Sequence, residues 1–233
     1  MPFSEKLETI KDVVLHKYRS SFRTIEQISE DNTLKILDAM RALRVSEAYF
    51  HTTSGYAYDD LGRQKLDELF AQVFGAEFAL VRTQFVSGTH ALATVLFGVL
   101  RPGDRLLSIT GTPYDTMQTV IGYANPSSGS LKEFGILYDE LPLVDGHVDI
   151  EGIEEAITPN TKMALIQRSR GYSSRAPLSV NDIKDICAAI KKKKADCVCF
   201  VDNCYGEFVD ILEPTQVGAD IMAGSLIKIP GGG

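Results

Sequence analysis

The sequence has few of the features that tie a protein to a membrane or a nucleic acid. No apolar run is long enough to cross a bilayer, and residues 1–5 lack the charged-then-apolar layout of a signal peptide. With 24 Lys and Arg against 31 Asp and Glu, the net charge is −7. The one positive cluster, at 191–194, closes a helical pattern, where cations suit the negative end of the helix dipole. We therefore expect no membrane partner and no nucleic-acid partner.

Cysteines are also few, and their spacing does not favour a metal site. All four fall between residues 187 and 204. Cys197 and Cys199 are two apart in a strand-like run, so their side chains point the same way, and no histidine lies nearby. We expect buried, reduced thiols in a cytoplasmic protein and no bound metal.

Apolar periodicity divides the chain into three regions, 1–50, 51–75 and 76–233. The first is predicted to be helical, and the second to be a polar loop followed by a helix at 64–74 that ends at Gly75. From residue 76, short apolar runs alternate with helical patterns. The predicted strands are 78–82, 105–110, 135–139, 163–167, 197–202 and 220–224, and the helices are 88–100, 114–122, 149–157 and 181–194. Strands that are apolar throughout predict an α/β fold, with a mostly parallel sheet covered by helices on both faces.

Ligands of open parallel sheets bind at the carboxyl ends of the strands, so polar residues that follow a strand are candidates for a site. Ser87, Gly88 and Thr89 stand where a small-residue turn opens a helix. Such a turn presents free N–H groups and the positive dipole end, which suit a phosphate. An ordinary serine N-cap with a glycine for the tight turn explains the same residues equally well.

Two charged residues follow later strands. Asp202 directly follows a buried strand, and burying a carboxylate there costs free energy unless a cation or a metal pairs with it. Alternatively, Asp202 caps the next helix or loop, as aspartate often does. Lys228 lies beside apolar residues that could lower its pKa and let it form a Schiff base with an aldehyde. Taken alone, Lys228 is better explained as a side chain that reaches from a strand end to water.

A phosphate turn, an aspartate at a strand end and a lysine at a later strand end, in that order, form a more specific pattern than any one of them alone. Together with the strings around these residues, the pattern makes the sequence resemble a known group. It is similar to fold-type I pyridoxal-phosphate enzymes of the Cys/Met-metabolism group, and most of all to the methionine gamma-lyase family / aluminium resistance protein branch. The similarity extends from about residue 50 to the end. The matching strings are 55–63 (GYAYDDLGR), 84–91 (QFVSGTHA), 111–117 (GTPYDTM), 201–208 (VDNCYGEF) and 223–228 (AGSLIK).

The resemblance implies a role for each matching residue. Lys228 would bind pyridoxal 5'-phosphate covalently and move protons between substrate carbons, and Asp202 would pair with the pyridine nitrogen. The cofactor phosphate would be held by Ser87, Gly88, Thr89 and Ser225, and Tyr114 would stack on the ring. Tyr58 and Arg63, within 51–75, would reach the phosphate of a neighbouring subunit, with Tyr56 as a competitor for the tyrosine role. The resemblance thus implies a homodimer or homotetramer with a shared active site.

Some residues depart from the better-known lyases. The segment 169–172 (SRGY) stands where those enzymes have a Ser/Thr-Pro-x-Asn-Pro turn, Cys204 replaces a usual threonine, and Ile229 follows the lysine. The chain also stops at three glycines just past Lys228, so we expect an incomplete large domain and the absence of the C-terminal domain. The arginine that would grip the substrate carboxylate has no counterpart here.

The resemblance implies a pyridoxal-phosphate-dependent carbon–sulfur lyase that acts by β- or γ-elimination on a sulfur amino acid such as cystathionine, methionine or cysteine. The alternative is a non-catalytic protein of the same fold with a scaffold role. A serine hydrolase using Ser225 and Lys228 is disfavoured, because that motif should open a helix and be joined by further motifs downstream. A dinucleotide-binding fold is disfavoured because the first strand–helix turn lacks the three-glycine spacing.

Overall fold

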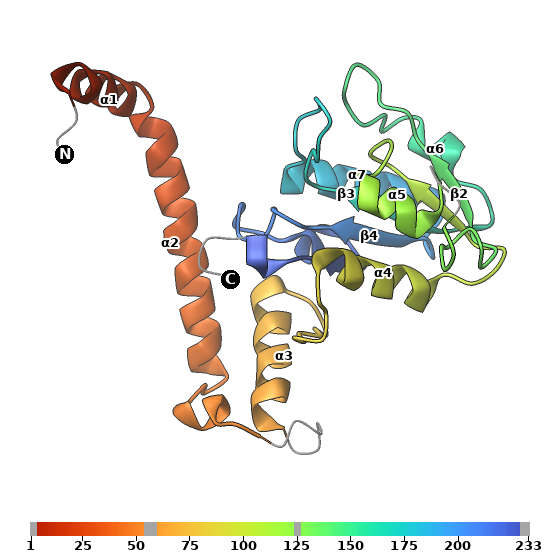
Figure 1. Cartoon of the computed structure of the whole chain (residues 1–233), viewed down its shortest axis with the longest axis horizontal. Helices are drawn as coiled ribbons and strands as arrows, with labels where there is room; N and C mark the ends of the chain where they lie inside the picture. Colours follow the sequence, from red (N-terminus) through yellow and green to blue (C-terminus); the bar gives the residue numbers. More distant parts are fainter. Residues whose placement is uncertain (1–3, 54–59, 124–126, 229–233) are drawn as a thin grey trace.

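A five-stranded parallel sheet forms the centre of the protein (Figure 1). The computed structural model describes residues 4–53, 60–123 and 127–228. The sheet has the order β2-β1-β3-β4-β5, and every neighbouring pair of strands is parallel. The strands are β1 (Arg105–Ser108), β2 (Leu137–Glu140), β3 (Thr161–Gln167), β4 (Val198–Asp202) and β5 (Ile221–Ala223). The predicted α/β fold is confirmed.

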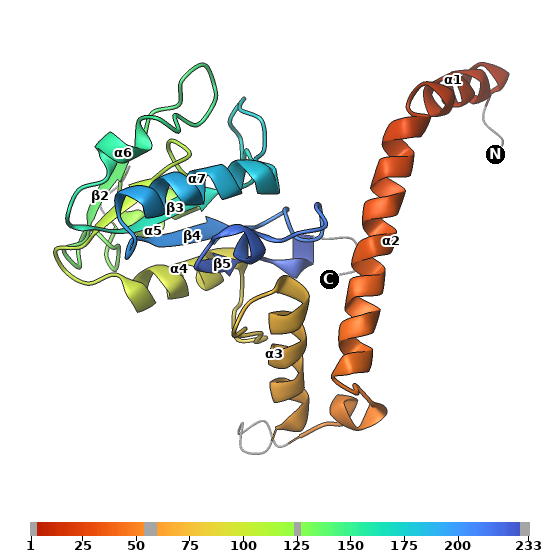
Figure 2. The same cartoon turned by 180° about the vertical axis from the view of Figure 1, so that it is seen from behind.

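Helices cover both faces of this sheet because successive strand residues point to opposite sides. On one face, Leu107, Ile166 and Val201 pack against α6 (Ile153–Ala156) and α7 (Val180–Lys193). On the other, Leu106, Leu165 and Phe200 pack against α4 (Gly88–Val99) and α5 (Asp115–Ile121). Figures 1 and 2 show α4 and α7 on opposite sides of β4. Strands apolar at every position are thus buried on both faces.

The order of the strands fixes where a ligand can bind. From β1 the chain passes through α5 to β2 on one side, then returns through α6 to β3 on the other side of β1. From β3 it continues in that second direction through α7 to β4. In open parallel sheets the crevice lies beyond the carboxyl ends of the strands where this direction reverses. That reversal lies between β1 and β3, and the residues that follow β4 lie at the same carboxyl edge of the sheet.

The region before the sheet is helical, as predicted, but it is divided. It contains α1 (Glu5–Lys17), α2 (Arg19–Ala42), the 3-10 helix η1 (Glu47–Phe50) and α3 (Leu61–Phe74). In both views α1 and α2 form an arm beside the sheet domain. The arm is attached where the buried Asn32 side chain donates hydrogen bonds to the carbonyls of Phe208 (3.0 Å) and Asp210 (3.1 Å).

A small apolar cluster extends this attachment. Ala39 of α2 packs with Val73 and Phe74 of α3, and the rings of Phe74 and Phe208 lie 5.1 Å apart. Helix α3 ends at Gly75, whose φ of +64° is a left-handed conformation that glycine adopts without strain. The arm and α3 are therefore joined to the turn that follows β4.

Two predicted elements differ from the structure. The strand predicted at 78–82 was wrong, because no strand forms there. The segment is instead held by Asp67, whose carboxylate accepts the Val81 N–H (2.9 Å) and pairs with Arg82 (2.7 Å). Phe78 and Leu80 are 88% and 60% exposed, so this apolar run buries nothing in the sheet. The helix predicted at 149–157 is limited to the single turn of α6.

No helix within residues 4–53, 60–123 and 127–228 is both long and apolar enough to cross a membrane. All four cysteines are free and buried, as predicted.

Replacing Phe200 tests the two-faced core. Phe200→Ala is expected to lower the free energy of unfolding by about 3–5 kcal/mol, because it empties a fully buried site between β4 and the α4 face. Urea denaturation followed by circular dichroism would measure this. The control Phe50→Ala, at a side chain that is 75% exposed, should change stability by less than about 0.5 kcal/mol. Equal effects of the two substitutions would contradict the packing described.

Candidate functional site

A buried carboxyl group ends β4. Asp202 is 4% exposed, and its Oδ1 accepts the backbone N–H of Cys204 at 3.1 Å. Burial raises the pKa of Asp202; the hydrogen bonds from Cys204 and the charge of Lys228 oppose this without overcoming it. Among the described residues, none forms an ion pair with Asp202 within 4.0 Å. Asp202 is therefore a buried acid that is suited to a cationic ligand.

The N-terminus of α4 meets the turn after β4 and the turn after β5. Ser87 caps the helix by accepting the His90 N–H at 3.1 Å. Gly88 is buried, and a Cβ there would lie 3.1 Å from Ser225 Cβ and 3.2 Å from Cys204 Sγ. A side chain at 88 would have to push Ser225 or Cys204 aside by a few tenths of an ångström, so glycine favours this close approach. The approach brings free N–H groups of a 12-residue helix to the Ser225 side chain. This arrangement suits an anion such as a phosphate.

Tyr114 joins this group from the segment after β1. Its hydroxyl lies 3.3 Å from Thr89 Oγ1, and its backbone N–H donates to Gln167 Oε1 at 3.1 Å. Burial raises the pKa of the Tyr114 phenol, and the nearby Asp202 charge adds to this rise. The phenol therefore stays protonated at neutral pH and can donate a hydrogen bond.

Lys228 lies in the 3-10 helix η3 (Leu226–Lys228), not at the end of a strand, because β5 stops at Ala223. Its side chain is exposed, and Nζ lies 4.5 Å from the centroid of the Tyr205 ring. The sequence suggested a lowered pKa for Lys228, and that suggestion was wrong. Burial lowers the pKa, but the surrounding Cys204, Tyr205, Asp202 and Tyr114 outweigh it and raise the value. The amine is therefore a cation that shares the site of Asp202.

The predicted residues fall into two groups. Ser87, Gly88, Thr89, Tyr114, Asp202, Ser225 and Lys228 gather around the N-terminus of α4 and the ends of β4 and β5. Arg63 does not join them, since it lies in the first turn of α3, at the end of that helix away from the sheet (Figure 1), and pairs with Asp60 at 3.5 Å. Tyr56 and Tyr58 lie outside the described residues.

Three further polar residues at this edge of the sheet received no role from the sequence. Gln167 ends β3 and holds the backbone of Tyr114. Arg168, 3% exposed, donates to Asn203 Oδ1 (2.8 Å) and pairs with Asp210 (2.7 Å). Glu207, 4% exposed, accepts the Ser225 N–H at 2.6 Å. The sequence signal that could have identified these three residues is a charged or amide side chain placed within or just after an apolar run.

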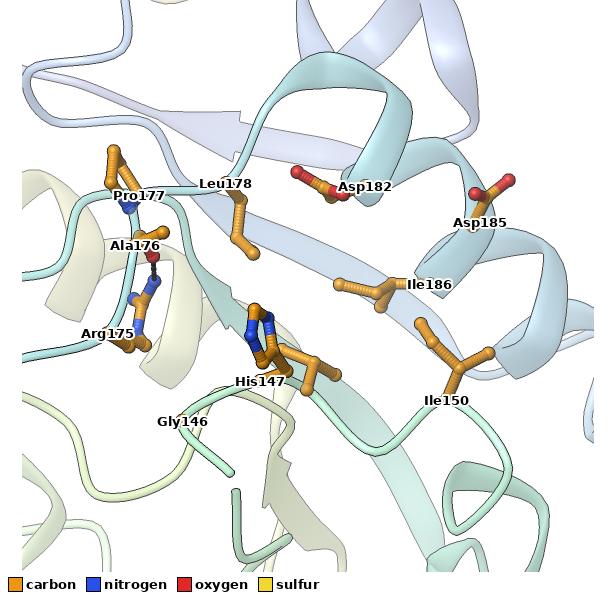
Figure 3. Close-up of a pocket in the computed structure, with 11 residues that line it drawn as sticks. Gly146, His147, Ile150, Arg175, Ala176, Pro177, Leu178, Asp182, Asp185 and Ile186 are labelled. Atoms are coloured by element: carbon orange, nitrogen blue, oxygen red, sulfur yellow. Dashed lines mark hydrogen bonds between the residues drawn. The ribbon is translucent and has the colours of Figure 1, made fainter. Parts of the chain in front are cut away.

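A separate cavity of about 180 Å³ lies between α7 and the turn at 146–150 (Figure 3). None of its lining residues belongs to the predicted site. Arg175 is buried there, and it donates to the carbonyls of Ala176 (2.9 Å) and Gln167 (2.6 Å). Asp182 is engaged in the N-terminal cap of α7. Because these polar groups already bond to the protein, the cavity is not the candidate site.

The gathered residues fit pyridoxal 5'-phosphate. The buried Asp202 carboxyl lacks a cationic hydrogen-bond partner, and the close approach at Gly88 forms a cradle that a Cβ would fill. A metal fits less well, since no three His, Cys, Asp or Glu side chains of the described residues form a group that could ligate an ion.

Comparison with known proteins points to one family. A family model described as methionine gamma-lyase matches residues 7–233. An uncharacterized protein, YnbB of Bacillus subtilis (strain 168), is 50% identical over 213 residues, which make up 91% of this chain and 51% of that protein. The chain therefore spans about half the length of this relative.

Solved structures agree with this match. The carbon–sulfur lyase involved in aluminium resistance from Clostridium novyi NT is 45% identical, with a TM-score of 0.91 over 96% of this chain and 54% of that one. A Campylobacter jejuni structure is 28% identical, with a TM-score of 0.52 over 70% of this chain and 35% of that one. It contains N'-pyridoxyl-lysine-5'-monophosphate, a lysine joined to the cofactor.

Neutralising Asp202 tests the electrostatics of the site. Because its folded-state pKa is raised above the ordinary 3.8, Asp202 contributes stability at low pH that is lost as pH rises through the folded pKa. At pH 8, Asp202→Asn should therefore stabilise the cofactor-free protein by about 1–3 kcal/mol, because the amide removes a buried charge that has no cationic partner and keeps an oxygen for the Cys204 N–H. Urea titrations at pH 5 and pH 8 would measure the difference between wild type and variant. The exposed control Asp185→Asn should show none, and a D202N protein less stable than wild type at pH 8 would contradict the assignment.

Proposed function

Since this chain belongs to the methionine gamma-lyase family, we propose that it supplies the cofactor-binding part of a pyridoxal-phosphate-dependent carbon–sulfur lyase. The observation that carries the proposal is the meeting of Asp202, the N-terminus of α4 and Lys228 at one edge of the sheet. Each of these three features suits a different part of the cofactor. The non-catalytic alternative has no comparable observation in its favour.

Asp202 would hold the pyridine nitrogen of the cofactor in its cationic form, and that pairing would compensate the burial of the carboxylate. The phosphate would lie at the N-terminus of α4, on the N–H groups of Gly88 and Thr89 and the hydroxyls of Ser87 and Ser225. Tyr114, held by Thr89 and Gln167, would face the ring. The carboxyl edge of the sheet would thus bind both ends of one small molecule.

When bound, the cofactor supplies a protonated ring that withdraws electrons from the amino acid attached to it. Lys228 would supply the amine that binds its aldehyde carbon and would later take the proton from the substrate α-carbon. Burial lowers the pKa of Lys228, and electrostatic interaction with Cys204, Tyr205, Asp202 and Tyr114 raises it by more. A cationic partner on Asp202 would offset part of that field and favour the neutral amine that this chemistry needs.

The proposed substrate is a sulfur amino acid of the cystathionine, methionine or cysteine class, from which a thiol leaves by β- or γ-elimination. The family description and the name of the Clostridium novyi protein support this class. The four buried free thiols support a reducing, cytoplasmic setting. Because the chain spans about half the length of its relatives, recognition of the substrate carboxylate is assigned to no residue here.

We further propose that two subunits share each site. Arg63 lies in the first turn of α3, far from the residues gathered around Lys228. It would instead reach the phosphate of a neighbour, together with Tyr58. A homodimer is the smallest assembly that completes the phosphate shell, and a homotetramer would contain two such pairs.

The attachment of the cofactor can be tested directly on the full-length protein. Wild type mixed with pyridoxal 5'-phosphate should gain an absorbance band near the edge of the visible range, which borohydride removes while fixing the label on Lys228. Mass spectrometry of the digested protein would locate that label. Lys228→Ala should take up no label, whereas Lys192→Ala, at an exposed lysine of α7, should be labelled like wild type. A wild-type protein without the band, or with the label elsewhere, would refute the proposal.

The shared site predicts that two inactive variants restore each other. Lys228→Ala and Arg63→Ala are each expected to lose most keto-acid release from sulfur amino acids. In a mixed dimer, one of the two sites has both native residues. If equal amounts of the two subunits pair at random, about half of the dimers are mixed, so the unselected population should regain about a quarter of wild-type activity. Co-expression with two different affinity tags, followed by an ammonia and keto-acid assay, would measure this. No recovery in verified mixed oligomers would argue against a shared site.

A further inference from the structure

Glu207 is a second buried carboxyl group at the site. It follows β4 by five residues, is 4% exposed, and accepts the backbone N–H of Ser225 through Oε1 at 2.6 Å. This hydrogen bond joins the turn after β4 to the turn after β5. It is short because a carboxyl group is a strong acceptor.

Placing Glu207 inward is costly to the protein. Its Oε2 atom is buried without a hydrogen-bond partner among the described residues. Tyr205 and Phe208 on either side have φ of 68° and 61°, in the left-handed region that side chains with a Cβ seldom adopt. Strain of this kind gathers at functional sites, where the surrounding structure holds it in place.

The neighbouring residues are adapted to this carboxyl group. A Cβ on Gly224 would lie 2.3 Å from Glu207 Oε1, so a larger residue there would force the carboxyl group out of its present position beside Ser225. The next residue, Ser225, contacts the N-terminus of α4 at Gly88, and its carbonyl accepts the Lys228 N–H at 3.1 Å. The same short turn therefore joins Glu207 to the phosphate cradle and to the lysine.

We propose that Glu207 is a positioning residue that fixes the turn at Gly224 and Ser225, and thereby orients the Ser225 hydroxyl and the Lys228 amine for pyridoxal 5'-phosphate. This inference rests on the proposed function. It adds a residue that acts through the backbone of the lysine-bearing segment rather than by touching the cofactor. Asp202, at the end of β4, would face the ring nitrogen at the other end of the cofactor, so the two carboxyl groups would have separate tasks.

The chemistry of the hydrogen bond suggests three substitutions in the full-length protein. Glu207→Gln keeps an oxygen acceptor at the same reach and should bind pyridoxal 5'-phosphate within about threefold of wild type. Glu207→Asp is one methylene shorter and Glu207→Ala has no acceptor. Both should bind the cofactor about 10- to 100-fold more weakly, the usual result of losing one buried hydrogen bond to a carboxyl group.

Two measurements separate positioning from a general structural effect. The first is hydrogen exchange of the peptide spanning 221–228 in cofactor-free protein, where the Ser225 amide should exchange at least about tenfold faster in E207D and E207A. The second is the pH midpoint of the absorbance band of the lysine-bound cofactor, which should shift in E207D and E207A. Glu213→Gln is the matched control, because Glu213 is equally buried but bonds Phe208 and Asn203 instead of Ser225.

Each outcome decides the proposal. Loss of affinity, faster Ser225 exchange and a shifted midpoint in E207D and E207A, with E207Q and E213Q near wild type, would support it. Unchanged affinity and exchange in E207A, or an equal midpoint shift in E213Q, would overturn the role of Glu207 while the proposed function stands. A wild-type protein that binds no cofactor would overturn both, and that result is seen without any variant.

Discussion

The hydrogen bond from Asn203 N to the Ala223 carbonyl, 2.8 Å long, is the contact on which the candidate site depends. It continues the β4–β5 pairing one step beyond Asp202, which is in register with Ala223. Strand β5 has only three residues, so this contact largely decides where the chain leaves the sheet. Because it does so beside Asp202, the lysine-bearing turn begins at the level of the buried carboxyl group.

The turn after β4 is stabilised by polar groups from several parts of the chain. The Arg168 guanidinium bonds Asn203 and the Gly206 carbonyl, and Glu213 accepts the Phe208 N–H at 2.8 Å. The Asn32 side chain of the arm donates a hydrogen bond to the Phe208 carbonyl in the same turn. A strained turn can be maintained only if its backbone groups are satisfied in this way, since each unmet buried group costs about 1–3 kcal/mol. Hydrogen bonds to this one turn therefore connect the arm, the sheet and the site.

The parts that the sequence predicted well are those governed by local chemistry. Apolar runs predicted all five strands of the sheet and the helices α4, α5 and α7, and the order of Ser87, Asp202 and Lys228 indicated the edge where they gather. The run at 78–82 has the composition of a strand, but composition does not show whether a neighbouring strand exists to pair with it. The pKa direction of Lys228 depends on groups from three other segments, including Tyr114. Glu207 escaped notice because the left-handed residue at Tyr205 breaks the alternation by which inward side chains are recognised.

The contact between Gly224 and Glu207 also restricts how this sequence can change over time. A side chain at 224 would displace the carboxyl group at 207 from its bond to Ser225, so a larger residue at the first position is tolerated better once a smaller one has appeared at the second. The reverse change, from a small residue to glutamate at 207, requires that glycine already be present at 224. Substitution of Gly224 is therefore expected to follow substitution of Glu207 and not to precede it.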